Sequence, residues 1–300
     1  MRGIGRRRRE HKIREPSHVD SNLAHHRRKR WENGGVFSAK SIKLHELGER
    51  ASPIVVLDDF RVRGQPFAPH PHAGFSALTY VFEDSEGRAR SRDSLGNDVV
   101  VGPGGIVWFQ AGSGAIHHEV PAETGRELHG AQIFVKLSAK NKHLAPRTFW
   151  LDRNDVPEWR NDSGDRVRVA VGSFEDVASP LVPAEPLDLL DVELHSAIDF
   201  DLRDGDRALV YVRSSSINVC AAGSEQDVPA GNAVVLHNGG GEVTFAASDH
   251  AHFLVLSGAE ILEPVVVDGP FIMNDRSQIE AAAARYRAGE MGYLAPILDN

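Results

Sequence analysis

PHPHAGFSALTY, residues 69–80, sets two histidines on either side of a proline at the start of an apolar run. Such a run, bounded by glycine and proline, is typical of a β-strand. Alternate side chains of a strand point to the same face, so His70 and His72 are expected to project together. Imidazoles that converge in this way are typical ligands of a metal ion, and a complete site needs more of them.

Further ligands are offered by GSGAIHHEVP, residues 112–121, in which His117 and Glu119 share a strand face. An antiparallel partner strand with this parity can set one imidazole and one carboxylate against the first two histidines. Three imidazoles and a carboxylate suit a divalent transition metal and leave octahedral positions open for water, oxygen or substrate. This donor set favours Fe(II) over a closed structural zinc site.

The fold is predicted to be all-β, because short apolar and β-branched runs alternate with turn signals and show no helical period. Two such blocks of similar size suggest a duplicated domain, each an antiparallel β-barrel or sandwich. The expected organisation is a basic, disordered extension at 1–35, a metal-binding barrel at 36–140, a linker at 141–166, a second barrel without metal at 167–268 and a helical segment at 269–300.

The C-terminal segment contains a predicted helix, in the stretch SQIEAAAARYRAGEMG at 277–292. Ser277 and Glu280 have the spacing of a capping box, and Gly289 is expected to end the helix. Ile279, Ala283 and Tyr286 fall on one apolar stripe.

Composition bounds the class of protein. The single cysteine, Cys220, excludes an internal disulfide and a site of several thiolates, and suits a reducing compartment. The longest apolar runs fall far short of the ~20 residues of a membrane span. No leader-type apolar segment follows the N-terminal arginines. We therefore expect a cytoplasmic protein without membrane contact.

Charge is unevenly distributed along the chain. The first thirty residues hold 11 Lys and Arg against 3 acids, and the remainder 23 against 39, a net charge near −16. RRRRE at 6–10 and HHRRKR at 25–30 allow an interpretation as a nucleic-acid arm or an import patch. A solvated extension explains them better, because this tail has almost no apolar side chains to bury. Nucleic acid is not expected as a partner.

A resemblance to known families rests on these motifs. Gly64 lies six residues before His70, which gives G-x5-H-x-H, the opening of the cupin barrel motif. Ser76 and Trp108 stand where cupins usually have their glutamate and third histidine, which leaves those roles to His117 and Glu119. In this combination residues 37–293 resemble the pirin family, through the segments HPHAGF, LTYVFE, RDSLGN, GPGG, WFQAGSGAIHHEVP, LHGAQIFV, GPFIMN and RYRAGEMG.

The resemblance implies a bicupin whose first barrel binds one metal ion, usually iron, while Mn, Co, Ni or Cu are alternatives. The implied ligands are His70, His72, His117 and Glu119, with Glu119 also acting as a catalytic base. The implied activity is that of a quercetin 2,3-dioxygenase, which opens the central ring of a flavonol with O2 and releases carbon monoxide. The alternative is an iron-dependent redox sensor that contacts a transcription factor or a metabolic enzyme.

The chain departs from the family pattern at two positions. Ala73 and Ser76 stand where the family usually has arginine and glutamate. These departures bear on the surroundings of the metal and on substrate preference, and leave the ligands unchanged.

Other residues have simpler interpretations. His118 has the wrong strand parity for a ligand, and His129 is interpreted as an ordinary strand histidine or as one that orients a ligand. Trp108, Phe109 and Phe134 are expected in the core or in the wall of a flavonoid-sized pocket.

In the second block, a further H-x-H pair at 250 and 252 has no carboxylate at matching spacing, so no second metal is expected there. No P-loop, dinucleotide fingerprint or serine-hydrolase elbow is present.

Overall fold

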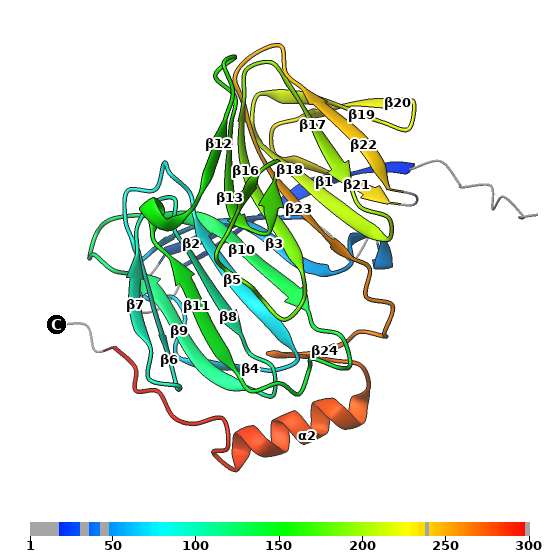
Figure 1. The fold of residues 1–300 in the computed structure, drawn as a ribbon. Helices are drawn as coiled ribbons and strands as arrows, with labels where there is room; N and C mark the ends of the chain where they lie inside the picture. Colours follow the sequence, from blue (N-terminus) through cyan, green and yellow to red (C-terminus); the bar gives the residue numbers. More distant parts are fainter. Residues whose placement is uncertain (1–17, 31–35, 43–47, 238–239, 298–300) are drawn as a thin grey trace, which may run out of the picture.

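The computed structural model describes residues 18–30, 36–42, 48–237 and 240–297. In these residues the regular secondary structure is almost entirely antiparallel β-strand, arranged as two halves (Figure 1). The predicted all-β class is confirmed, and so is a short helix near the C-terminus, α2 (Arg276–Arg287). No helix of the described ranges is long and apolar enough to cross a membrane.

The N-terminal half contains one large and one small sheet. Its strands are β2 (Val36–Ile42), β3 (Ile54–Arg63), β4 (His70–His72), β5 (Phe75–Val81), β6 (Ala89–Asp93), β7 (Asp98–Val101), β8 (Ile106–Gln110), β9 (Ala115–Pro121), β10 (Leu128–Lys136) and β11 (Arg147–Leu151). The large sheet has the order β11-β8-β5-β10-β3-β2 and the small sheet the order β4-β9-β6-β7. Buried side chains from both sheets, such as Phe60 and Val101, pack together between them.

The C-terminal half has the same construction. Its strands are β12 (Glu158–Arg160), β13 (Arg166–Val171), β14 (Ser173–Phe174), β15 (Val177–Ala178), β16 (Leu187–Leu194), β17 (Ala197–Leu202), β18 (Asp206–Ser214), β19 (Ser216–Ala221), β20 (Ser224–Pro229), β21 (Asn232–His237), β22 (Gly241–Ala246) and β23 (Ala251–Ala259). The order β21-β18-β23-β16-β13 repeats β8-β5-β10-β3-β2, and β17-β22-β19-β20 repeats the small sheet. The topology therefore describes an internal duplication.

The interface between the halves contains two equivalent hydrogen bonds, as the duplication implies. Tyr80 on β5 donates a hydrogen bond of 2.8 Å to Asp191 on β16. Tyr211 on β18 donates one of 2.7 Å to Asp59 on β3, the equivalent pair with the halves exchanged. A buried apolar cluster that includes Trp108 surrounds these pairs, so the predicted core position of Trp108 is confirmed.

The N-terminal region differs from the prediction of a disordered extension over 1–35. Residues 18–30 form strand β1 (His18–Arg30), which pairs with β21 through its first part, 18–23, and with β2 through its second part, 24–30 (Figure 1, blue). The two large sheets thereby become one sheet of 13 strands. The prediction failed for these residues because it considered only apolar side chains, whereas a strand between two open edges is held by backbone hydrogen bonds. The rest of 1–35 lies outside the described residues.

The predicted linker over 141–166 also contains regular structure. β11 extends the large sheet of the N-terminal half beside β8, and β12 extends that of the C-terminal half beside β13. Between them lies a short 3-10 turn, η2 (Arg153–Asp155); a second one, η1 (Gly48–Ala51), precedes β3. The polar composition misled the prediction, since edge strands tolerate exposed polar side chains.

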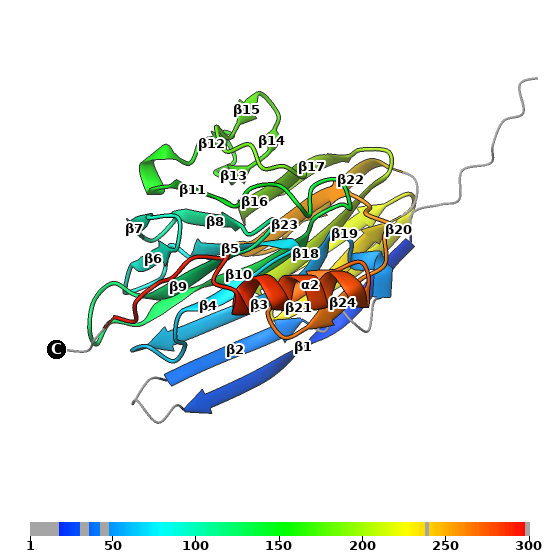
Figure 2. The same ribbon diagram turned by 90° about the horizontal axis from the view of Figure 1, so that it is seen from below.

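The C-terminal segment returns to the N-terminal half. The hairpin β24 (Val266–Asp268) and β25 (Phe271–Met273) leads into α2, which packs beside it (Figure 2). Ile279 on the helix shares an apolar cluster with Ala73 and Ile116 of the first half. The helix begins two residues earlier than the predicted capping box, because Asp275 accepts from the backbone N–H of Gln278 and is the N-cap in place of Ser277.

Candidate metal centre

The two histidine-bearing strands are paired with each other. β4 and β9 run antiparallel, with His70 directly opposite His117. Gly74, which follows β4 with a φ of +85°, allows the chain to turn against β25, since a Cβ there would lie 2.0 Å from the Ile272 carbonyl oxygen. The predicted pairing of these two segments is thus what the structure has.

Three imidazoles converge from these strands. One ring nitrogen from each of His70, His72 and His117 lies within 4.8 Å of the other two. The Nε2 atoms of His70 and His117 are 3.1 Å apart. The ring centroids are separated by 4.6 to 4.8 Å.

Backbone carbonyls fix how two of these rings face. The Nδ1 of His70 lies 2.9 Å from the Ala68 carbonyl oxygen, and that of His72 lies 3.3 Å from the Pro270 carbonyl oxygen. A carbonyl can only accept, so each Nδ1 carries the proton and each Nε2 presents a lone pair to the centre. His117 is held by stacking on Phe109, with ring centroids 4.8 Å apart and planes within 6°.

The electrostatics keep the imidazoles neutral. Burial lowers the pKa of all three histidines, and that of His72 falls to about 3 with a further contribution from His70. A neutral imidazole is the form that binds a metal. The Nδ1 of His117 is buried and has no hydrogen-bond partner. Three neutral imidazoles that converge in this way, with so few hydrogen bonds of their own, fit a divalent transition metal.

Glu119 faces the same cavity from β9, but its carboxylate does not belong to the cluster of three nitrogens. Its Oε2 accepts a hydrogen bond of 2.9 Å from the Thr79 hydroxyl. Burial raises the pKa of Glu119 to about 7, and hydrogen bonds from Thr79 and Ser91 oppose this rise. The carboxyl group can therefore take up or release a proton near neutral pH.

A cavity of about 330 Å³ lies over these groups. Its volume falls in the range of sites for small organic ligands. The three histidines and Glu119 share the lining with the polar residues Ser41, Asp58, Thr79 and Gln132 and with the apolar residues Phe37, Ala39, Phe60, Val62, Phe67, Leu128 and Phe134. Phe134 also contacts the edge of the His72 ring, with centroids 5.6 Å apart. Such a cavity suits a flat aromatic molecule.

The other histidines singled out in the sequence lie away from this centre. His118 is buried on the opposite face of β9, and its Nε2 donates to the Phe67 carbonyl oxygen at 3.0 Å. His129 lies near the interface of the halves, where its Nε2 is 3.0 Å from Asp59 Oδ1 and its Nδ1 is 3.1 Å from Asp84 Oδ1. Neither contacts the three converging rings through these bonds.

Sequence reasoning missed several groups at the site. Thr79 comes from β5 and Gln132 from β10, directly opposite each other in the sheet. The carbonyl groups of Ala68 and Pro270 orient two rings, and no sequence pattern marks a backbone acceptor. The one signal available was that Thr79 is a polar residue within a run of mainly apolar residues, which the structure shows to be a fully buried strand.

Comparison with known proteins shows which family has this architecture. The chain matches the family model of pirin over residues 25–135 and the pirin C-terminal cupin domain over 189–292. A Pseudomonas aeruginosa protein with the provisional name quercetin 2,3-dioxygenase is 36% identical over 256 residues, which cover 80% of this chain and 87% of the relative. The protein is thus a bicupin, as the two duplicated halves indicate. It belongs to the pirin family.

Solved structures show the same fold. A quercetin 2,3-dioxygenase from Acinetobacter baumannii has a TM-score of 0.78 at 23% identity, covering 92% of this chain and 98% of that one. The bacterial pirin YhhW of Escherichia coli, solved in complex with nickel(II), has a TM-score of 0.63 at 18% identity, covering 81% and 100%. The predicted bicupin fold is therefore confirmed.

Proposed function

We propose that this protein is a metal-dependent dioxygenase that opens the central ring of a flavonol such as quercetin with O2 and releases carbon monoxide. The observation that carries the proposal is the juxtaposition of three neutral imidazoles and one carboxyl group in an aromatic-lined cavity of about 330 Å³. The provisional name of the Pseudomonas relative supports the same chemistry.

The metal would be held by His70, His72 and His117, with Glu119 as a fourth ligand. Fe(II) is the preferred ion, and Mn, Co, Ni or Cu are alternatives with the same donor preferences. When bound, such an ion supplies Lewis acidity toward the substrate oxygens and a route for reaction with O2.

Glu119 has a second role in this proposal, as the base that accepts the proton of the flavonol hydroxyl. Its position in the cavity wall supports that role, and a carboxyl group with a pKa near the working pH is well matched to it. The Thr79 hydroxyl donates to Oε2 and holds the carboxyl group in place.

The aromatic wall would orient the substrate. Phe134 lies beside the His72 ring, and Phe67 is 39% exposed and stands where the cavity meets solvent. A flat polyphenol can pack against such rings while its oxygens face the polar groups.

The test is production of carbon monoxide from a panel of flavonols under air by protein loaded separately with Fe(II), Mn, Co, Ni and Cu. We expect carbon monoxide from quercetin with at least one metal, and its loss in His72→Ala. The matched control is His143→Ala, an exposed histidine outside the cavity. No carbon monoxide with any metal or flavonol would reject the enzyme and favour the redox-sensing regulator.

A further inference from the structure

We propose that Glu193, His250 and His252 form a second metal site, on the C-terminal half, which takes a borderline divalent ion such as Zn(II) or Ni(II). In the part of the chain that the structure describes, two groups bring three ligand atoms within 4.8 Å of one another, and this is the second. The site goes beyond the proposed function and shares no residue with it.

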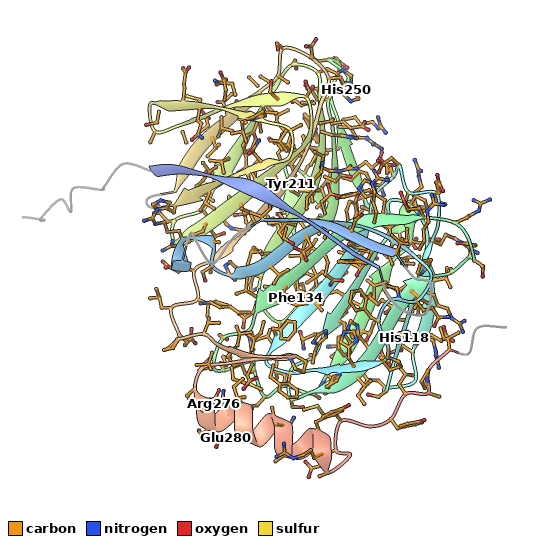
Figure 3. The ribbon with its side chains drawn as sticks, turned by 180° about the vertical axis from the view of Figure 1, so that it is seen from behind. His118, Phe134, Tyr211, His250, Arg276 and Glu280 are labelled. Atoms are coloured by element: carbon orange, nitrogen blue, oxygen red, sulfur yellow. The ribbon has the colours of Figure 1, made fainter. Side chains whose placement is uncertain are left out.

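The sheet register assembles the site. His250 immediately precedes β23 and His252 is the second residue of that strand, and the ligand nitrogens of the two side chains lie within 4.8 Å of each other. Glu193 on the neighbouring strand β16 is the direct cross-strand partner of His252. The ring centroids of the two histidines are 5.5 Å apart, and Figure 3 shows His250 at the far end of the C-terminal half from Phe134.

The donor atoms are close and incompletely bonded. Nε2 of His252 lies 2.8 Å from Oε1 of Glu193. The same nitrogen is buried and faces the carboxylate directly, so the two donor atoms are already placed to share one ion. The ring of His195 stacks on His250 with centroids 4.2 Å apart and planes within 4°, which holds that imidazole beside the other two groups.

Arg166 competes for the carboxylate but does not remove it from the site. Its guanidinium contacts both oxygens of Glu193, at 2.9 Å and 2.7 Å. Arg166 also pairs with Glu83 of the first half, so its charge is shared between carboxylates. A carboxylate oxygen has two lone pairs, and ligating carboxylates are commonly hydrogen-bonded by a neighbouring side chain. Arg166 can thus orient Glu193 while an ion binds the remaining lone pair.

The donor set selects the class of ion. Two imidazoles and one carboxylate suit Zn, Ni, Co, Cu or Fe(II), whereas Mg and Ca prefer oxygen ligands only. His250 is exposed and His252 and Glu193 are partly so, which leaves water to complete the coordination. The site is therefore open to exchange with solution.

The position of the site links it to the interface of the halves. Glu193 is joined through Arg166 to Glu83, which belongs to the connection after β5. An ion bound to the folded protein alone stabilises it by mass action. Zn(II) should accordingly raise the midpoint of thermal unfolding through this site even when the first centre is disabled.

The test is a Zn(II) titration of full-length protein against a chromophoric chelator, with wild type, His250→Ala, Glu193→Gln and the matched control His143→Ala. We expect His250→Ala and Glu193→Gln each to weaken one equivalent of Zn(II) by at least ~100-fold, the upper end for groups around a metal. His143→Ala should bind like wild type. A His250→Ala protein with the wild-type number and affinity of Zn(II) equivalents would overturn the site.

A second experiment separates this site from the first centre. In His117→Ala protein, Zn(II) should still raise the unfolding midpoint, and the added change His250→Ala should abolish that rise. A rise that persists in the double variant, or that is absent from His117→Ala alone, would also overturn the proposal. Neither result depends on flavonol turnover, so the proposed function can fail while this inference stands.

Discussion

Replacing Glu119 by glutamine tests the proposed base directly. The change keeps the size of the side chain and an oxygen that can accept from Thr79, but it removes the negative charge and the basicity. Loss of a general base costs between ~10² and ~10⁴ in rate. Phe67 at the cavity mouth is 39% exposed, so water can reach the cavity and take over part of the proton transfer. We therefore expect the low end, a loss of ~10²-fold, equal to about 2.7 kcal/mol in the barrier.

The assay must separate chemistry from metal loading. Rates are expressed per bound metal at saturating quercetin under air, with carbon monoxide as the diagnostic product and metal content measured on the same sample. Glu123→Gln is the matched control, because this carboxylate is paired with Arg88 on the surface and lies outside the cavity. A Glu119→Gln protein with the wild-type rate per metal would refute the role of Glu119 as base.

The dependence of rate on pH gives a second readout. Protonation of a base abolishes its function, so the wild-type rate should fall as pH falls through the pKa of Glu119. Burial raises that pKa to about 7 against the hydrogen bonds from Thr79 and Ser91, and a bound cation lowers it, so the acidic limb lies at or below pH 7. The limb should be missing from Glu119→Gln.

Three further predictions concern Thr79, His129 and strand β1. Thr79→Val removes a hydrogen bond that lowers the pKa of the cavity carboxyl, so the acidic limb should move to higher pH, and Thr79→Ser should restore it. His129 is held between Asp59 and Asp84, which raise its pKa against the effect of burial. Its contribution to stability is therefore complete below pH ~6.5 and is lost as pH rises through the raised pKa. In His129→Gln, the free energy of unfolding measured with urea should depend less on pH in that window. Removal of residues 1–30 opens the edges of β2 and β21 and should lower the unfolding midpoint by at least ~4 °C, whereas an unchanged midpoint would show that β1 adds no stability.

The sequence predicts those parts of the metal centre that depend only on which strand face a side chain occupies. The period of a strand is local, so the shared faces of His70 with His72 and of His117 with Glu119 follow from spacing alone. The carbonyl groups of Ala68 and Pro270 could not be predicted, because any residue supplies one and only the fold decides where it points.

The duplication left a signal in the sequence that was overlooked. Ala77, Leu78, Tyr80 and Val81 on β5 correspond to ALVYV at 208–212 on β18, and the two tyrosines make equivalent bonds across the interface. Such short repeats become informative only when the strand orders can be compared.

The remaining features that the sequence analysis did not find depend on pairing between distant strands. The carboxylate beside the second H-x-H pair stands about sixty residues earlier in the chain, on a neighbouring strand, so a search along one segment cannot find it. The strand β1 likewise depends on edges that belong to two different halves. Non-local pairing of this kind is set by topology, which single-segment patterns do not contain.

Each end of the chain contacts the half that is distant from it in sequence, and this affects how the chain folds during synthesis. β1 finds one of its partners in β21, about two hundred residues later, and the carbonyl that orients His72 belongs to Pro270. A ribosome that has produced the first half has therefore not yet produced the parts that close it. The nascent N-terminal half leaves an open sheet edge and an unsupported ligand until translation is nearly complete, so metal acquisition is expected to follow release of the chain.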